Sequence, residues 1–162
     1  MHAFRIPSVL ALVASLGLLG CGDLATPPSL DELGPEFFVI LRPAVIPVSI
    51  DIKPGSDPNS INCTNHKESI AVAILTTDDF DATTVDHTTV TFEGATETHV
   101  NKKTGVARRH EEDVDGDGDT DLVLHFRLGD TGLTCDSTEG SLEGETFDGQ
   151  GIEGTDAVRM ID

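Results

Sequence analysis

Tryptophan and tyrosine are absent from this sequence of 162 residues, and phenylalanine, with seven copies, is its only large aromatic residue. Many sugar-binding and base-stacking surfaces are built on exposed aromatic faces, so the scarcity disfavours both classes. Basic residues are also few: ten Lys and Arg against 29 Asp and Glu give a formal net charge of −19. Because nucleic-acid recognition needs a basic surface, we expect no nucleic-acid partner, and the charge favours divalent cations instead.

Long apolar runs are missing as well. Residues 9–19 are apolar or small and uncharged, but a membrane-spanning helix needs about 20 such residues. The run follows Arg5 and has the length of the apolar part of a secretory signal peptide. It ends in Leu18-Leu19-Gly20-Cys21, which resembles the lipobox of bacterial lipoproteins.

In that family a peptidase cuts before the cysteine, and the cysteine then carries acyl chains such as palmitate. The resemblance implies a signal peptide over residues 1–20 and lipidation of Cys21, so that the protein is anchored in the cell envelope. The residue after the cysteine is Gly22 and not aspartate, which favours the outer membrane, on its periplasmic or surface face. The alternative is an ordinary signal peptide followed by a chance cysteine.

Residues 21–44 are rich in proline and acidic residues, which is typical of a flexible tether. The remainder, residues 45–162, is long enough for one domain. With Cys21 assigned to lipid, Cys63 and Cys135 remain as an even pair, and we expect them to form a disulfide outside the cytoplasm. Two free thiols are one alternative, and a zinc site that includes Cys63 and His66 is another.

The domain shows β patterns and no apolar period of 3.6 residues. Large apolar residues recur at every second position around Ile50, Val72 and Leu124, and turn residues separate the runs. Residues 96–106 predict a hairpin, and a final strand pair is expected on either side of Asp148-Gly149. Short strands without helical crossovers predict an all-β, antiparallel, immunoglobulin-like β-sandwich, with a small barrel or a jelly roll as the alternative.

One short segment carries most of the chemistry. It fits D-x-D-x-D-G-x-x-D, and its carboxylates belong to Asp113, Asp115, Asp117, Asp119 and Asp121. Calcium prefers six to eight oxygen ligands, and Gly118 permits the sharp turn that brings the first three side chains together. We expect Asp119 to offer its backbone carbonyl and Asp121 to bind directly or through water. The sequence therefore predicts a Ca²⁺ site, with a solvated acidic turn as the alternative.

The segment is not a complete EF-hand, because Leu124 stands where a bidentate glutamate belongs. It resembles the calcium loops of FG-GAP and VCBS-type repeats, which implies the ion and a following strand but not the fold of those repeats. More widely, residues 45–162 resemble a β-rich domain of exported bacterial proteins. Three segments carry this resemblance: residues 50–62, residues 72–86, and the acidic loop with the strand that follows it. That resemblance implies no activity.

A second acidic cluster contains Asp78, Asp79 and Asp81. It is either a further cation site or a set of turn and N-cap residues beside an inward-facing Phe80. We expect the domain to be a non-catalytic structural or protein-interaction module that is tethered to the membrane and binds a protein partner in the envelope or on the cell surface. The alternative function is a calcium-assisted hydrolase of the cell envelope.

Overall fold

The computed structural model describes residues 44–162. The predicted signal peptide, Cys21 and nearly all of the predicted tether lie outside these residues. The described part is built from strands, with two short 3-10 helices and no α-helix. The elements in chain order are β1 (Ile46–Pro47), β2 (Ile50–Ile52), β3 (Ser60–Asn62), β4 (Ser69–Ile74), η3 (Ala82–Thr84), β5 (Val85–Phe92), β6 (Ala95–Thr96), β7 (His110–Glu112), β8 (Asp121–Arg127), η4 (Leu128–Asp130), β9 (Glu139–Thr146), β10 (Gly151–Ala157) and β11 (Arg159–Ile161).

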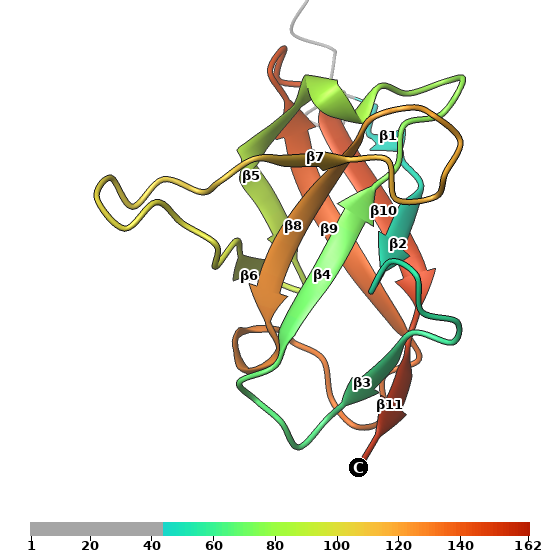
Figure 1. Ribbon diagram of the computed structural model, residues 1–162, viewed down its shortest axis with the longest axis vertical. Helices are drawn as coiled ribbons and strands as arrows, with labels where there is room; N and C mark the ends of the chain where they lie inside the picture. The colour runs from blue at the N-terminus through green and yellow to red at the C-terminus, as the bar shows by residue number, and fades with distance from the viewer. Residues whose placement is uncertain (1–43) are drawn as a thin grey trace, which may run out of the picture. The chain divides into compact units, whose positions relative to one another are not determined.

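Two sheets face each other across the core (Figure 1). One has the order β2-β4-β8-β7 and the other has the order β1-β10-β9-β5-β6. With β2, β4, β5, β7, β8, β9 and β10 taken as strands A to G, these orders contain the A-B-E-D and C-F-G sheets of an immunoglobulin-like sandwich. The neighbours within these sheets are antiparallel except for β1, which runs parallel to β10. The predicted sandwich is therefore confirmed.

The core forms where the alternating apolar faces of the two sheets meet. Val72 on β4 lies opposite Leu124 on β8, and both side chains are fully buried. Phe126 reaches across to Phe92 on β5, with ring centroids 5.5 Å apart. A Cβ added at Gly140 on β9 would lie 2.6 Å from the Phe92 ring, so the packing tolerates no side chain there. Each such buried apolar side chain contributes about 1.5–3 kcal/mol.

A disulfide joins Cys63 to Cys135, with a sulfur–sulfur distance of 2.04 Å. Cys63 directly follows β3, and Cys135 lies in the connection between η4 and β9. This confirms the predicted pairing, and neither free thiols nor a zinc site with His66 describes these residues. The bond closes a separation of 72 residues at the end of the sandwich where β3 pairs with β11 (Figure 1).

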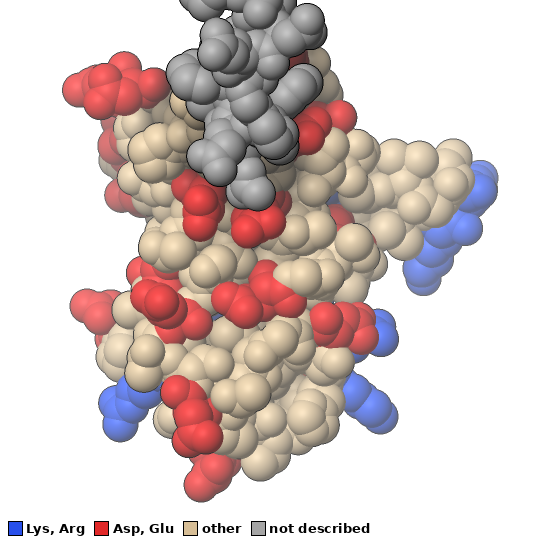
Figure 2. Space-filling model, turned by 180° about the vertical axis from the view of Figure 1, so that it is seen from behind, with Lys and Arg blue, Asp and Glu red and all other residues tan. Residues whose placement is uncertain are grey.

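A hairpin arm, residues 97–109, projects from the side of the sandwich between β6 and β7 (Figure 1). Its two limbs pair through a bridge between Val100 and Ala107, which confirms the predicted hairpin. Arg109 fixes the base of the arm, because its guanidinium donates to the carbonyl oxygens of Thr83 and Val85 at 2.6 and 2.9 Å. Figure 2 shows acidic side chains spread over the back of the molecule and basic ones at the end of the arm.

Candidate metal site

The acidic loop predicted from the sequence is the connection between β7 and β8. The two strands pair antiparallel, with Glu112 opposite Asp121, so residues 113–120 must turn back within a short distance. Gly116 and Gly118 have φ values of 81° and 98°, a region that glycine adopts without steric cost. The strand register and the two glycines together fix where the acidic side chains of the loop lie.

Three of the predicted ligands come together in this loop. Carboxylate oxygens of Asp113, Asp115 and Asp117 all lie within 4.8 Å of one another, and the three residues are exposed. Each also accepts a backbone N–H of the loop: Gly116 donates to Asp113 at 2.8 Å, Asp117 to Asp115 at 3.2 Å and Asp119 to Asp117 at 2.8 Å. These bonds orient the carboxylates without using all their lone pairs, so the group could hold a metal ion.

The charges around this group repel one another. The N–H of Asp117 lowers the pKa of Asp115, but desolvation and the charges of Asp117 and Asp121 outweigh it, so the pKa is raised. The pKa of Asp51 on β2 is raised as well, by burial first and then by the charges of Asp156 and Asp115. A raised carboxylate pKa means that the folded site disfavours the ionised form. A bound cation would relieve that cost.

The other two predicted ligands lie differently. Asp119 is exposed and its carboxylate is not part of the group of three. Asp121, at the start of β8, is only 1% exposed. Its Oδ1 accepts the N–H of Thr76 and its Oδ2 accepts the N–H of Val114, both at 2.9 Å. Asp121 thus ties the loop to the chain that follows β4.

The second acidic cluster does not gather as a ligand group among residues 44–162. Asp81 is the N-cap of η3, and its Oδ1 accepts the N–H of Thr83 at 2.8 Å. Phe80 is partly buried and packs against the core. For Asp81 and Phe80 the structure agrees with the turn-and-cap interpretation, because the carboxylate stabilises the start of the 3-10 helix.

A cluster of three histidines, His99, His110 and His125, was missed by reasoning from the sequence. They come from the arm, β7 and β8, and their ring centroids lie 4.6 Å (His99–His110), 5.9 Å (His99–His125) and 5.7 Å (His110–His125) apart. Nδ1 of His99 lies 2.7 Å from Nε2 of His110. No sequence motif marks these residues: they meet because His110 pairs with Val123, which sets His110 diagonally beside His125.

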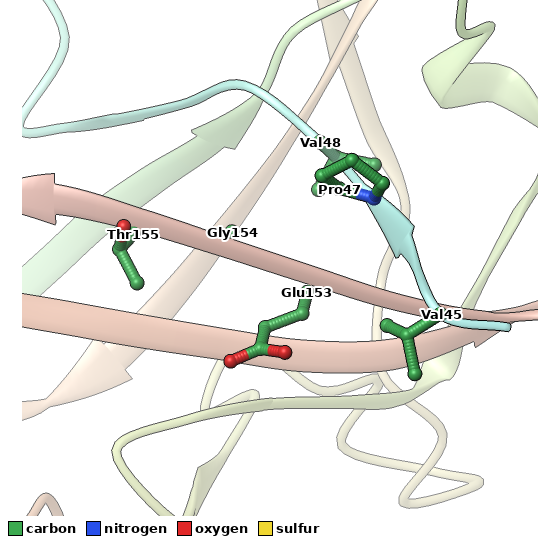
Figure 3. A pocket seen from close by; sticks show the side chains of 6 residues that line it. All are labelled: Val45, Pro47, Val48, Glu153, Gly154 and Thr155. Atoms are coloured by element: carbon green, nitrogen blue, oxygen red, sulfur yellow. The ribbon is translucent and has the colours of Figure 1, made fainter. Parts of the chain in front are cut away.

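One groove lies beside these features, and a separate hollow lies on the other sheet. A groove of about 390 Å³ is lined by residues that include Glu112, Val114, Val123 and His125, so it runs between the acidic loop and the histidine cluster. Figure 3 shows a second hollow between β1 and β10, lined by Val45, Pro47, Val48, Glu153, Gly154 and Thr155. The second hollow offers a single carboxylate, whereas the first lies beside two groups of metal-ligating side chains.

Comparisons with models of protein families, with curated proteins and with solved structures found no match to this chain. Among residues 44–162 no helix is both long enough and apolar enough to cross a membrane. The resemblances drawn from the sequence therefore stay predictions, and the geometry of the described residues carries the functional argument.

Proposed function

We propose that this chain is a calcium-binding lipoprotein of the cell envelope, held to a membrane by lipid on Cys21. Its domain acts as a structural or protein-interaction module. The observation that carries the calcium part is the convergence of Asp113, Asp115 and Asp117 on one exposed loop. The non-catalytic role stays a prediction from the sequence, and a calcium-assisted hydrolase is the alternative.

The choice of calcium follows from the ligands. Three carboxylates on an exposed loop suit a hard cation with a variable oxygen shell, and water completes the coordination. Magnesium demands a near-octahedral arrangement at shorter distances, which such a loop satisfies less well. The raised pKa of Asp115 supports a cation of some kind, because the carboxylates repel one another without it.

A structural role for the ion follows from where the loop begins and ends. It joins β7 to β8, and β8 contributes Leu122, Leu124 and Phe126 to the core. Extracellular modules of this kind bind calcium with dissociation constants of about 10⁻⁴–10⁻³ M. An affinity in that range suits a site that is filled outside the cell and orders the connection between two strands.

Location in the envelope is supported by two independent features. The disulfide between Cys63 and Cys135 is the kind of bond that persists in oxidising compartments. The Leu18-Leu19-Gly20-Cys21 segment supplies the lipid anchor, and several acyl chains on one residue hold a protein far more firmly than one chain. The exposed lysines Lys102 and Lys103 at the end of the arm would contact an acidic surface of a partner.

Calorimetric titration of the chelator-treated full chain tests the calcium assignment. We expect uptake of one equivalent at millimolar calcium, and loss of the heat in the double variant Asp115→Asn with Asp117→Asn. A matched control is Asp78→Asn with Asp79→Asn, which changes the charge equally in the other acidic cluster. Absence of saturable heat, or the same heat in the loop variant, would refute the assignment.

Fractionation of the native cells tests the anchor. We expect the wild-type protein in the membrane fraction and Cys21→Ser in the soluble fraction, because the variant cannot be acylated. A Cys63→Ser variant is the control, since it also replaces a cysteine by serine and breaks the disulfide but leaves the lipobox intact. Retention of Cys21→Ser in the membrane would contradict the lipoprotein assignment without touching the calcium assignment.

A further inference from the structure

Beside the acidic loop, but built from different donors, the three-histidine cluster forms a second place where side chains that bind metals converge. Imidazole nitrogens suit zinc, copper and nickel, whereas calcium prefers oxygen. We propose that His99, His110 and His125 bind a divalent transition-metal ion of the zinc or copper class. This inference does not depend on calcium binding at Asp113, Asp115 and Asp117.

The spacing of the ring centres is compatible with such an ion. A metal–nitrogen bond of about 2.0–2.1 Å puts the centre of each bound ring about 3.2 Å from the metal. At a tetrahedral angle, the centres of two bound rings are then about 5.2 Å apart. The observed centroid distances of 4.6, 5.9 and 5.7 Å lie on either side of that value. The ring nitrogens of the three residues do not all lie within 4.8 Å of one another, so binding requires at least one ring to turn toward the other two.

The ring nitrogens also need a partner. Nδ1 of His99 and Nε2 of His110 lie 2.7 Å apart, so one proton is shared between two basic atoms. An ion in place of that proton would hold them about 3.3 Å apart. Nδ1 of His125 is buried and has no hydrogen-bond partner. A buried polar atom without a partner is uncommon and costly, and coordination to a metal ion, once the ring turns toward the other two, would satisfy it.

A buried carboxylate positions two of the three backbones. Glu97 is 7% exposed, and its two oxygens accept the N–H groups of His99 at 2.5 Å and of His125 at 2.6 Å. Thr98 strengthens the same link, because its N–H and its hydroxyl both donate to the carbonyl of His125 at 2.8 and 2.9 Å. The arm is thereby held against β8 before any ion binds, which is the preorganisation that a metal site needs.

Three protein donors leave the fourth position of a tetrahedral ion open. The groove of about 390 Å³ is lined by His125 and by the carboxylate of Glu112. Water, Glu112 or a small ligand in the groove would complete the coordination sphere. The ion would also cross-link the arm to the sheet, since His99 lies on the arm and the other two histidines lie on β7 and β8.

Titration of the purified full chain with zinc chloride, in a calcium-saturated buffer, tests the site. We expect one equivalent of zinc to bind, with the affinity lowered at least tenfold in His99→Ala and in His125→Ala. His66→Ala is the matched control, because His66 is exposed and belongs to a different loop, and its affinity should equal that of the wild type. The double variant Asp115→Asn with Asp117→Asn should also bind zinc normally.

No saturable zinc uptake, or equal affinity in the wild type and in His99→Ala, would overturn the proposal. So would loss of zinc uptake in the double aspartate variant, because the ion would then occupy the acidic loop. His99 lies on the exposed arm, so His99→Ala keeps the test valid even where His125→Ala unfolds. As a second readout, zinc should slow amide hydrogen exchange in residues 98–108 of the wild type and leave it unchanged in His99→Ala.

Discussion

Calcium should raise the melting temperature of this protein by an amount that can be worked out in advance. The perturbation is the addition of 10 mM calcium chloride to chelator-treated protein. An ion that binds only the folded state stabilises it by RT ln(1 + [L]/Kd). In the folded chain the pairing of β7 with β8 holds the ends of the loop that carries the predicted ligands, and binding to the unfolded chain is taken as negligible.

With a dissociation constant of about 10⁻⁴–10⁻³ M, 10 mM calcium stabilises the fold by about 1.4–2.7 kcal/mol. The entropy of unfolding is about 2.1 cal/mol/K per residue, which for a folded domain of about 120 residues amounts to about 0.25 kcal/mol/K. The expected rise in melting temperature is therefore about 6–11 °C. A rise of this size is readily measured by scanning calorimetry.

The decisive comparison is between two double variants that change the net charge equally. Asp115→Asn with Asp117→Asn should abolish the rise, while Asp78→Asn with Asp79→Asn should leave it intact. The loop variant should also melt higher than the wild type without calcium, so the calcium-dependent difference is the quantity to compare. A full rise in the loop variant would refute the reasoning, and a rise lost only in the other variant would move the ion to the second acidic cluster.

Three further outcomes are expected. Asp121→Asn should lower the free energy of unfolding by about 1–3 kcal/mol even without calcium, because one of the two partly buried N–H groups that Asp121 accepts loses its acceptor; an unchanged urea midpoint would contradict this role. Cys63→Ser with Cys135→Ser should lower the free energy of unfolding in urea by up to about 4 kcal/mol, since the disulfide closes a separation of 72 residues. A decrease below about 1 kcal/mol would contradict a stabilising role for the disulfide. In calcium-free protein the pKa of Asp115 is raised, so its ionised carboxylate destabilises the fold. This destabilisation is absent below the pKa of Asp115 in the unfolded chain and is complete above its pKa in the folded protein. Asp115→Asn should therefore stabilise the protein at pH 7 but not at pH 3. Equal stabilisation at both pH values would refute the electrostatic explanation.

Much of the fold could be predicted because its signals are local. The alternation around Val72 and Leu124 identified which faces are buried, and Asp148-Gly149 marked the last hairpin, where Gly149 has a φ of 77°. Cysteine pairing followed from parity once Cys21 was assigned to lipid. Each of these conclusions uses residues whose spacing along the chain is itself the physical constraint.

The acidic loop shows where local reasoning becomes insufficient. Spacing correctly brought Asp113, Asp115 and Asp117 together, because these residues share one tight turn. It gave no reason to separate Asp121 from them, although Asp121 bonds to Thr76, 45 residues earlier. That contact depends on β4 and β8 being neighbours, which no pattern within the loop encodes. A motif therefore predicts its own turn better than it predicts the contacts of its last residue.

The histidine cluster extends this reasoning to a site with no motif at all. His99, His110 and His125 are separated by 11 and 15 residues; the first two stand in polar stretches, and His125 stands within the apolar strand β8. They meet because the arm returns the chain to β7 and because β7 pairs with β8 in one register. A shift of that register by one residue would turn His110 to the opposite face of the sheet, away from His125. The same pairing sets the ends of the acidic loop, so a single strand register positions both of the proposed metal sites.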